Sequence, residues 1–347
     1  MWNSFTERVV NLNNQKEVAE IRDFLAPFEL SFDGQVDYTV AIMDNDTLIA
    51  TGSLSGPVLR NFAVDENYQG ENLTGKVVTH LLSEAARRGH FHTFLFTKPK
   101  IVQLFTQLGF ALLCEVEKAA LLETGLPSIA NYKQDLAAQT ADLPPGRRAV
   151  LVMNCNPFTK GHQAIIEQAA RECDSVVVLV VSEDQSAFPF AVRYELVKAG
   201  VKHLANVRVV PSGPYTVSRA TFPDYFVKGN DVVTAQTQLD AKLFAVHIAP
   251  TLQATVRYVG EEPYCEVTRA YNSALAAVLP QHGIEVKVVR RLAQDDEAIS
   301  ASKVRELIRQ GKIAEIAAIV PETTYEYLQS AQAKVIIEKI RTFSTRH

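Results

Sequence analysis

From residue 149 onward, short apolar runs alternate with helix-length segments, and this alternation constrains the fold more than any other feature of the chain. The apolar runs that we expect to form strands span 149–153, 175–181, 207–210, 255–259 and 284–289. The segments that we expect to form helices span 163–171, 190–203 and 267–279. Strands that alternate with helices in this way predict a parallel sheet covered by helices.

The last part of the chain, from Ser302 onward, contains only helical patterns. They lie within "VRELIRQGKIAEIAAIV" and "TTYEYLQSAQAKVIIEKI" and are broken at Gly311 and Pro321. We expect these helices to pack as a C-terminal cap.

The first 136 residues have a different texture. The stretch "VDYTVAIMDNDTLIATGSLSG" predicts two strands around an Asp-Asn-Asp turn, followed by a strand at 58–64 and a helix over 76–87. This is an α+β pattern. The stretch "AAQTADLPPGRR" then interrupts the apolar patterning with two prolines and a glycine. We therefore predict a first domain at 1–136, a linker at 137–147 and a second domain at 148–347.

Composition excludes several classes of protein. With 347 residues, of which 47% are hydrophobic, the chain can bury a large core and divide into domains. A net charge of -4 and scattered lysines and arginines provide no basic field for nucleic acid. The start has no apolar signal core, and the longest aliphatic run, 176–181, is too short to span a bilayer. The four cysteines form no C-x-x-C pair. We expect a cytoplasmic protein with reduced cysteines, no membrane or nucleic-acid partner and no protein-bound metal.

The stretch "NCNPFTKGHQAII" follows the first expected strand of the parallel sheet. Ligands of such sheets bind beyond the carboxyl ends of the strands, where this loop would lie. A helix that begins near Gly161 presents unpaired N–H groups and partial positive charge to a phosphate. Thr159 and His162 are three positions apart, and both can donate hydrogen bonds to a phosphoryl oxygen.

A second stretch, "AISASKVRELIRQG", has similar chemistry. Ser300 is a natural N-cap, Ser302 lies in the first helical turn, and Arg305 follows on the same helical face. Each stretch alone is equally well explained as an ordinary capped helix. Because both occur, separated by an α/β pattern of suitable length, they predict the two sides of a phosphate site.

The pair T-x-G-H and I-S-x-S-x-x-R resembles the H/T-x-G-H and I-S-S-T-x-x-R signatures of the nucleotidyltransferase superfamily. Together with "SEDQSAFPFAVRYELVKAG", "FPDYFVK" and "RYVGEEPYCEVTRAYN", the chain from Arg148 to the C-terminal helices resembles the citrate lyase ligase family. The resemblance implies a Rossmann-like nucleotidyltransferase domain with C-terminal helices, preceded by a smaller N-terminal domain.

The resemblance also implies a reaction. Acetate attacks the α-phosphorus of ATP, pyrophosphate leaves, and the acetyl-adenylate acylates the thiol of the prosthetic group on the citrate lyase acyl carrier protein. Mg²⁺ is expected with ATP, to shield the triphosphate charge. This chemistry requires positioning and charge stabilisation more than an enzyme nucleophile.

Site residues are carried over from the matching motifs. The resemblance implies catalytic roles for four residues, His162, Thr159, Ser302 and Arg305. His162 and Thr159 would stabilise the α-phosphoryl group, and Ser300 would join Ser302 and Arg305 on the outer phosphates. The full set expected to bind the nucleotide is Asn156, Pro157, Phe158, Lys160, Gly161, Gly260, Glu262, Ile299, Ser300 and Ser302.

Some of these assignments have alternatives, and the motifs depart from the common pattern. Gly260 and Glu262 also fit a polar loop after a strand, and Arg193, a candidate substrate contact, also fits an exposed helical arginine. Thr159 stands where a histidine is more frequent. Asn156 stands where many relatives carry an aspartate, whose role is therefore unfilled.

The first domain resembles the GNAT acyltransferase family in its order of strand, loop, helix and late Gly-Phe segment. Its loop has Asn72 and Thr74 at the glycine positions of that family's pyrophosphate loop. These side chains argue against acetyltransferase activity and leave docking of the acyl carrier, or of its coenzyme-A-like arm, as the alternative. The stretch "GENLTGKV" only approximates a phosphate-binding P-loop, because Val77 replaces the hydroxyl that would bind Mg²⁺.

Three functions remain open from the residues. The first is the acyl-adenylating ligase. The second is an adenylyltransferase that acts on a phosphorylated acceptor, such as a pantetheine phosphate or a mononucleotide. The third is a regulatory module in which the nucleotide site senses ATP and the first domain transfers the acyl group.

Overall fold

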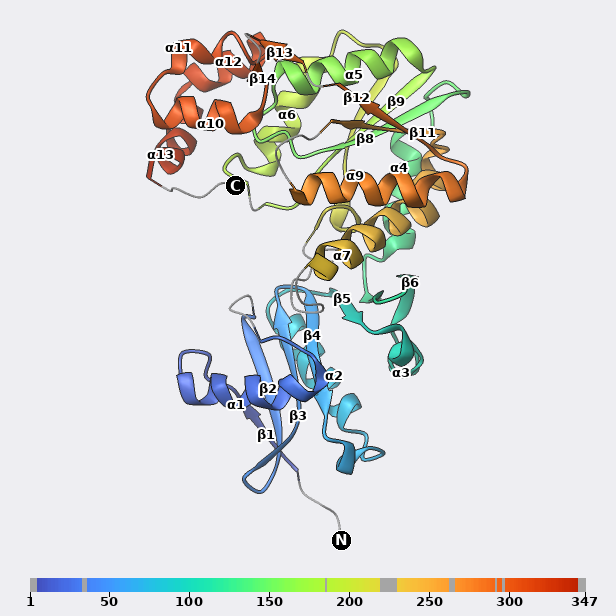
Figure 1. The fold of residues 1–347 in the computed structure, drawn as a ribbon, viewed down its shortest axis with the longest axis vertical. Helices are drawn as coiled ribbons and strands as arrows, with labels where there is room; N and C mark the ends of the chain where they lie inside the picture. Colours follow the sequence, from blue (N-terminus) through green and yellow to red (C-terminus); the bar gives the residue numbers. More distant parts are fainter. Residues whose placement is uncertain are drawn as a thin grey trace. The chain divides into compact units, whose positions relative to one another are not determined.

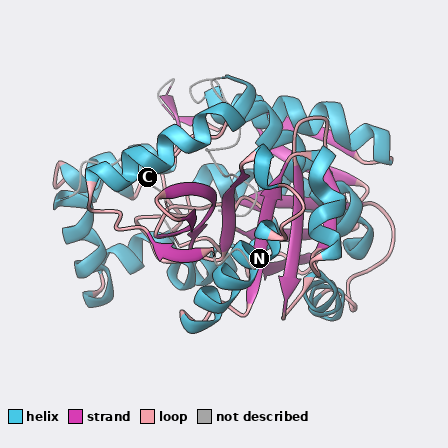
Figure 2. Ribbon diagram, turned by 90° about the horizontal axis from the view of Figure 1, so that it is seen from below, coloured by secondary structure: helices cyan, strands magenta, loops and turns pink. Residues whose placement is uncertain are grey.

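A computed structural model describes residues 5–32, 36–184, 186–218, 230–261, 266–290, 292–294 and 297–342. The chain divides into two compact units, which are described separately. The first contains Met1–Asn131 and Arg219–Lys242, and the second contains Tyr132–Ser218 and Leu243–His347. The helices and strands of both units are distinguished by colour in Figure 2.

The first unit is built on a mixed sheet in the order β1-β2-β3-β4-β5-β7-β6. Its strands are β1 Thr6–Val9, β2 Tyr38–Asp44, β3 Thr47–Ser55, β4 Val58–Val64, β5 His92–Thr97, β6 Ala111–Glu115 and β7 Ala120–Gly125. Its helices are α1 Gln15–Leu25, α2 Leu73–Arg87 and α3 Val102–Gln107. Only β4 and β5 pair in parallel; the other neighbours are antiparallel. The predicted hairpin around Asp44 to Asp46 is confirmed, and α2 begins three residues before the predicted helix.

Two of the chain boundaries between the two units fall within helices. Helix α4 spans Ile129–Gln139 and therefore continues into the segment expected to be a linker. Helix α7 spans Asn230–Leu243, and most of it groups with the first unit although it follows the start of the parallel sheet in the chain. The domain limits at 136 and 148 stay predictions.

The second unit contains a parallel five-stranded sheet in the order β10-β9-β8-β11-β12 (Figure 1). Its strands are β8 Arg148–Met153, β9 Ser175–Val180, β10 Val207–Pro211, β11 Val256–Gly260 and β12 Glu285–Val289. The helices that connect them are α5 Lys160–Glu172, α6 Phe190–Val201, α8 Ala249–Leu252 and α9 Glu266–Val278, and a π-helical segment, Phe244–Ile248, precedes α8. Each strand and helix predicted here is confirmed to within a few residues. The chain reverses direction across the sheet at β8, so the ligand crevice of such a fold lies at the carboxyl ends of β8 and β11.

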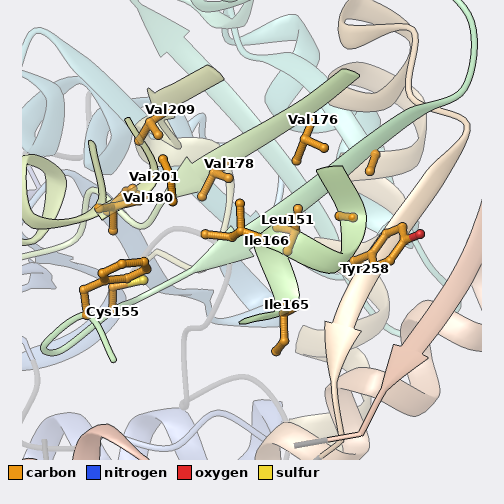
Figure 3. Packing of buried hydrophobic residues seen from close by; sticks show 14 of the residues in the cluster. Leu151, Cys155, Ile165, Ile166, Val176, Val178, Val180, Val201, Val209 and Tyr258 are labelled. Atoms are coloured by element: carbon orange, nitrogen blue, oxygen red, sulfur yellow. The ribbon is translucent and has the colours of Figure 1, made fainter. Parts of the chain in front are cut away.

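Aliphatic side chains fix the position of α5 on this sheet. Leu151, Val176 and Val178 are fully buried and belong to one cluster with Ile165 and Ile166 of α5, in which Ile166 lies beside Leu151 and Val178 (Figure 3). Helix α6 contributes to the same cluster, whereas α9 lies on the other side of the sheet (Figure 1). The start of α5 is therefore held at the carboxyl edge of β8 by a close-packed core.

After β12, the chain forms a short hairpin and the C-terminal helices. The hairpin strands are β13 Ala293–Gln294 and β14 Glu297–Ala298, and the helices are α10 Ala301–Arg309, α11 Ile313–Ile316, α12 Glu322–Gln329 and α13 Lys334–Thr342. The breaks predicted at Gly311 and Pro321 are confirmed. The structure adds one further break after Pro321, at Ser330 and a 3₁₀ turn, Ala331–Ala333.

Candidate active site

The first half of the candidate site is the start of α5. Thr159 caps the helix, and its Oγ1 accepts a hydrogen bond from the His162 N–H at 3.4 Å. In return, the Thr159 N–H donates to His162 Nδ1 at 3.1 Å, and Thr159 Oγ1 lies 2.9 Å from the same nitrogen. The two residues that the sequence singled out thus form a capping box, in which each satisfies a polar group of the other.

This capping box assigns the tautomer of His162. Because Nδ1 accepts a backbone hydrogen bond, its lone pair is occupied and the ring proton of the neutral imidazole lies on Nε2. The ring also stacks on Phe158, with centroids 5.9 Å apart and planes inclined by 15°. Phe158 is fully buried against Gly200 of α6, where a Cβ would come within 2.4 Å of its ring. Nε2 is therefore a hydrogen-bond donor on an oriented ring.

The second half of the site is the start of α10. The predicted N-cap is confirmed, because Ser300 accepts a hydrogen bond from the Lys303 N–H at 3.2 Å. Ser302 Oγ accepts a hydrogen bond from Arg305 Nη2 at 3.3 Å. This half therefore combines a helix N-terminus, two hydroxyls and a guanidinium.

The two halves meet in space although they are far apart in sequence. Arg305 Nη1 donates to the Asn156 carbonyl oxygen at 2.5 Å, across 149 residues of chain. A Cβ on Gly161 would lie 3.1 Å from the Ile299 carbonyl oxygen, so glycine permits this close approach. Arg305 is only 6% exposed; burial, with a smaller contribution from Arg309, lowers its pKa, yet a guanidinium keeps its charge at neutral pH.

Lys160 connects the first motif to the C-terminal helices. Its backbone N–H donates to the Ile319 carbonyl at 3.0 Å, and its ammonium donates to the carbonyls of Ala318 and Ala317 at 2.8 and 3.2 Å. The last two carbonyls lie at the end of α11, where a cation is favourable. In this structure the ammonium is therefore held by main-chain oxygens beside the site.

Arg193 differs from the alternative that the sequence left open. It is fully buried, so the interpretation as an exposed helical arginine is wrong. The reason is that its guanidinium binds oxygens of two loops, namely Asn154 O and Oδ1, Val181 O, Glu183 O and Phe188 O. A direct contact with substrate stays a prediction.

The end of β11 is only partly described. Gly260 closes the strand beside the start of the first motif, and its carbonyl accepts a hydrogen bond from Asn272 Nδ2 at 3.0 Å. A Cβ there would lie 3.2 Å from Ile165 of α5. Glu262 lies outside the described residues.

Cys155 borders the site but is not a candidate nucleophile. Its side chain is 1% exposed, and burial raises the pKa of the thiol well above its usual range. A thiol in such surroundings stays protonated and inert.

Two residues of the loop after β9, Ser186 and Phe188, contribute to the site and were not predicted from the sequence. Phe188 donates its N–H to Asn156 Oδ1 at 3.0 Å, and Asn154 Nδ2 donates to Ser186 Oγ at 3.0 Å. Both interactions join the loop after β8 to the loop after β9. Their only sequence signal is their position after neighbouring parallel strands, which places the two loops at one edge.

The first unit contains a separate cleft of about 800 Å³. It lies where β4 and β5 diverge, after the two parallel pairs Val58–Phe94 and Leu59–Leu95. Gln69, Asn72 and Thr74, from the loop compared with a pyrophosphate loop, line this cleft. Gly75 and Lys76 lie inside α2, which begins at Leu73, so the second part of the approximate P-loop motif is helical.

Within the described ranges, no helix is long and apolar enough to cross a membrane. Among the same residues, no three His, Cys, Asp or Glu side chains gather as metal ligands would.

Comparison with known proteins connects this geometry to a family. A parallel sheet with two capped helix N-termini at its switch point is typical of nucleotide-binding α/β proteins. A family model described as "Citrate lyase ligase C-terminal domain" matches residues 148–328. The chain is 37% identical over 329 residues to a citrate (pro-3S)-lyase ligase of Klebsiella pneumoniae, covering 93% of this chain and 95% of that protein. The corresponding ligase of Escherichia coli strain K12 is 35% identical, covering 92% of this chain and 93% of that protein. The chain belongs to the citrate lyase ligase family and is a ligase.

Shorter similarities exist as well. A phosphopantetheine adenylyltransferase of Pasteurella multocida is 46% identical over 57 residues, which are 16% of this chain and 36% of that protein. A solved acyl-CoA N-acyltransferase of Klebsiella pneumoniae matches 36% of this chain and 99% of its own, with 20% identity and a TM-score of 0.30.

Proposed function

We propose that this ligase activates acetate with ATP and acetylates the thiol of the prosthetic group on the acyl carrier protein of citrate lyase. An acetate oxygen attacks the α-phosphorus, the bond to the bridging oxygen of pyrophosphate breaks, and acetyl-adenylate forms. The carrier thiol, losing its proton, then attacks the acetyl carbonyl, and AMP leaves. Acetylation in this way would activate citrate lyase.

One observation carries the proposal, the hydrogen bond from Arg305 Nη1 to the Asn156 carbonyl. It joins α10 to the loop that leads into α5, so that two positive helix ends serve one site. A triphosphate chain needs such a set of fixed donors, because the reaction moves charge among its oxygens.

We assign roles by position in this arrangement. His162 Nε2 and Thr159 would face the α-phosphoryl group, where negative charge grows in the transition state. Ser300, Ser302 and Arg305 would hold the outer phosphates. The remaining members of the proposed nucleotide site are Asn156, Pro157, Phe158, Lys160, Gly161, Gly260, Glu262 and Ile299.

Mg²⁺ fits this proposal as a companion of ATP. The motif supplies Asn156 in place of an aspartate, and its Oδ1 already accepts the Phe188 N–H. A magnesium ion would therefore be held mainly by phosphate oxygens, as is usual for this metal, and would supply charge shielding.

Pyrophosphate release tests the proposal. The full chain is incubated with ATP and Mg²⁺, with acetate and the carrier, with acetate alone, or with a pantetheine phosphate. We expect sustained release only with acetate and the carrier. The short similarity to a phosphopantetheine adenylyltransferase keeps one alternative under test. Release with the phosphorylated acceptor and none with acetate would overturn the ligase proposal.

A further inference from the structure

Phe188 lies at a junction between the two loops of the candidate site and the C-terminal helices. Its N–H donates to Asn156 Oδ1 at 3.0 Å, and its carbonyl accepts from Arg193 Nε at 2.9 Å. Its side chain is fully buried in a cluster that includes Val304 and Leu307 of α10. One residue thus contacts the first motif through its backbone, and its ring belongs to the same buried cluster as the helix of the second motif.

Arg193 of α6 binds both loops of the same junction. Nη1 donates to Asn154 O at 2.9 Å and to Val181 O at 2.7 Å, and Nη2 donates to Glu183 O at 2.9 Å. With the bond from Nε to Phe188, all three guanidinium nitrogens bind protein oxygens. Arg193 therefore fixes the loops after β8 and β9 to each other instead of presenting its charge to solvent.

The second motif depends on this junction. Helix α10 is linked to the first motif in two ways, through Arg305 on the Asn156 carbonyl and through the buried cluster that Val304 and Leu307 share with Phe188. A shift of Phe188 would move α10, and with it Ser302 and Arg305, relative to Thr159 and His162. A mutation far from the reacting atoms that misplaces a catalytic group by about 1 Å can lower the reaction rate by about 10²-fold.

We propose that Phe188 and Arg193 are positioning residues, which set the separation of the two helix starts without contacting the substrates. This inference rests on the proposed function and adds the element that couples the two halves of its site. It assigns to Arg193 a role in loop geometry, in place of the substrate contact expected from sequence.

The test uses the full chain and the conservative variants Phe188→Leu and Arg193→Lys. Acetate-dependent exchange of labelled pyrophosphate into ATP gives kcat and KM for ATP, calorimetry gives the Kd for ATP, and thermal unfolding reports the folded fraction. Arg208→Lys is the matched control, because Arg208 of β10 is a half-buried arginine that pairs with Asp142 at 2.6 Å, away from both motifs.

We expect both variants to remain folded at the assay temperature and to lose kcat about 10-fold, with a smaller change in KM. A double-mutant cycle of Phe188→Leu with Arg305→Lys should be strongly non-additive, since both changes displace the same donor. Additive losses, or folded variants with wild-type kcat, would overturn the inference. If one variant unfolds, the other carries the test.

The two proposals fail in different ways. If the wild type binds ATP but shows no acetate-dependent exchange, the proposed ligase reaction is wrong, and the Kd for ATP takes over as the readout of positioning. In that case Phe188→Leu and Arg305→Lys should still be coupled in Kd, and independence of the two would overturn the inference.

Discussion

The two helix starts of the candidate site hold their polar groups in different ways. The start of α5 is organised locally, because Thr159 and His162 satisfy each other within one turn. The start of α10 is capped locally by Ser300, but the guanidinium of Arg305 binds the carbonyl of Asn156, which is 149 residues away in the chain. We infer that substitutions in the first half mainly remove chemistry, whereas substitutions in the second half also alter geometry.

Substitution of His162 has the largest expected effect on activity, and two variants distinguish the roles of its two ring nitrogens. His162→Asn retains an acceptor near Nδ1, and with it the cap, but removes the donor at Nε2. We expect adenylation to fall on the order of 10²-fold, in line with the loss of one transition-state donor. Thermal unfolding should stay close to that of the wild type. His162→Gln, which places an amide nitrogen near Nε2, should keep more activity and less stability. The opposite ranking of the two variants would contradict the assigned tautomer.

Arg305→Lys tests the long-range anchor of the second half. A single ammonium cannot reproduce the fork that reaches both the Asn156 carbonyl and Ser302. We expect kcat/KM for ATP to fall about 10-fold or more, as for loss of a buried charge-assisted bond. Arg309→Lys, which changes the next arginine of α10 and its surface pair with Glu306, is the control. Equal effects at both positions would argue against an anchoring role for Arg305.

Alanine variants of Ser300 and Ser302 distinguish a capping role from a role in ligand binding within one helical turn. Ser300→Ala should lower the free energy of unfolding by about 1 kcal/mol, because the Lys303 N–H loses its acceptor. Ser302→Ala should change stability by less than about 0.5 kcal/mol and instead raise KM for ATP. Urea denaturation and steady-state kinetics measure the two quantities. Loss of stability in Ser302→Ala without a kinetic change would reverse the assignment.

Lys160→Met has the smallest expected effect on activity. The ammonium is bound to the carbonyls of Ala317 and Ala318, so its removal should lower the free energy of unfolding by about 1 kcal/mol. KM for ATP should rise only slightly, and Lys160→Arg should restore stability. A large rise in KM without a loss of stability would show that the ammonium moves to the phosphates when ATP binds.

The elements of the second unit were predictable because buried parallel strands are nearly all apolar. Val176 to Val180 reads as a strand without ambiguity, and Ser300 is recognised as a cap from residue type and position. Helix α7 and the π-helical segment, Phe244–Ile248, were missed, since "DVVTAQTQLDAKLFAVHIAP" opens with β-branched Val and Thr residues of modest helix propensity.

The burial of Arg193 could not be predicted for a different reason. Its helix, "FAVRYELVKAGV", is apolar on most sides, so periodicity does not reveal which face points inward. The acceptors of Arg193 are main-chain carbonyls of two loops, and carbonyls leave no trace in residue identity. The contacts of Lys160 could not be predicted for the same reason, because its partners are main-chain carbonyls of two alanines more than 150 residues later in the chain.

Acetylation of the carrier protein tests the central claim most directly. The full chain is mixed with acetate, ATP, Mg²⁺ and the acyl carrier protein that bears its thiol prosthetic group, and the mass of the carrier is followed. The proposed two-helix ATP site predicts that one acetyl group is added only when ATP is present, and that His162→Asn slows the addition. An unchanged carrier mass with folded wild-type protein that binds ATP would contradict this claim. Acetylation that proceeds without ATP would contradict it as well.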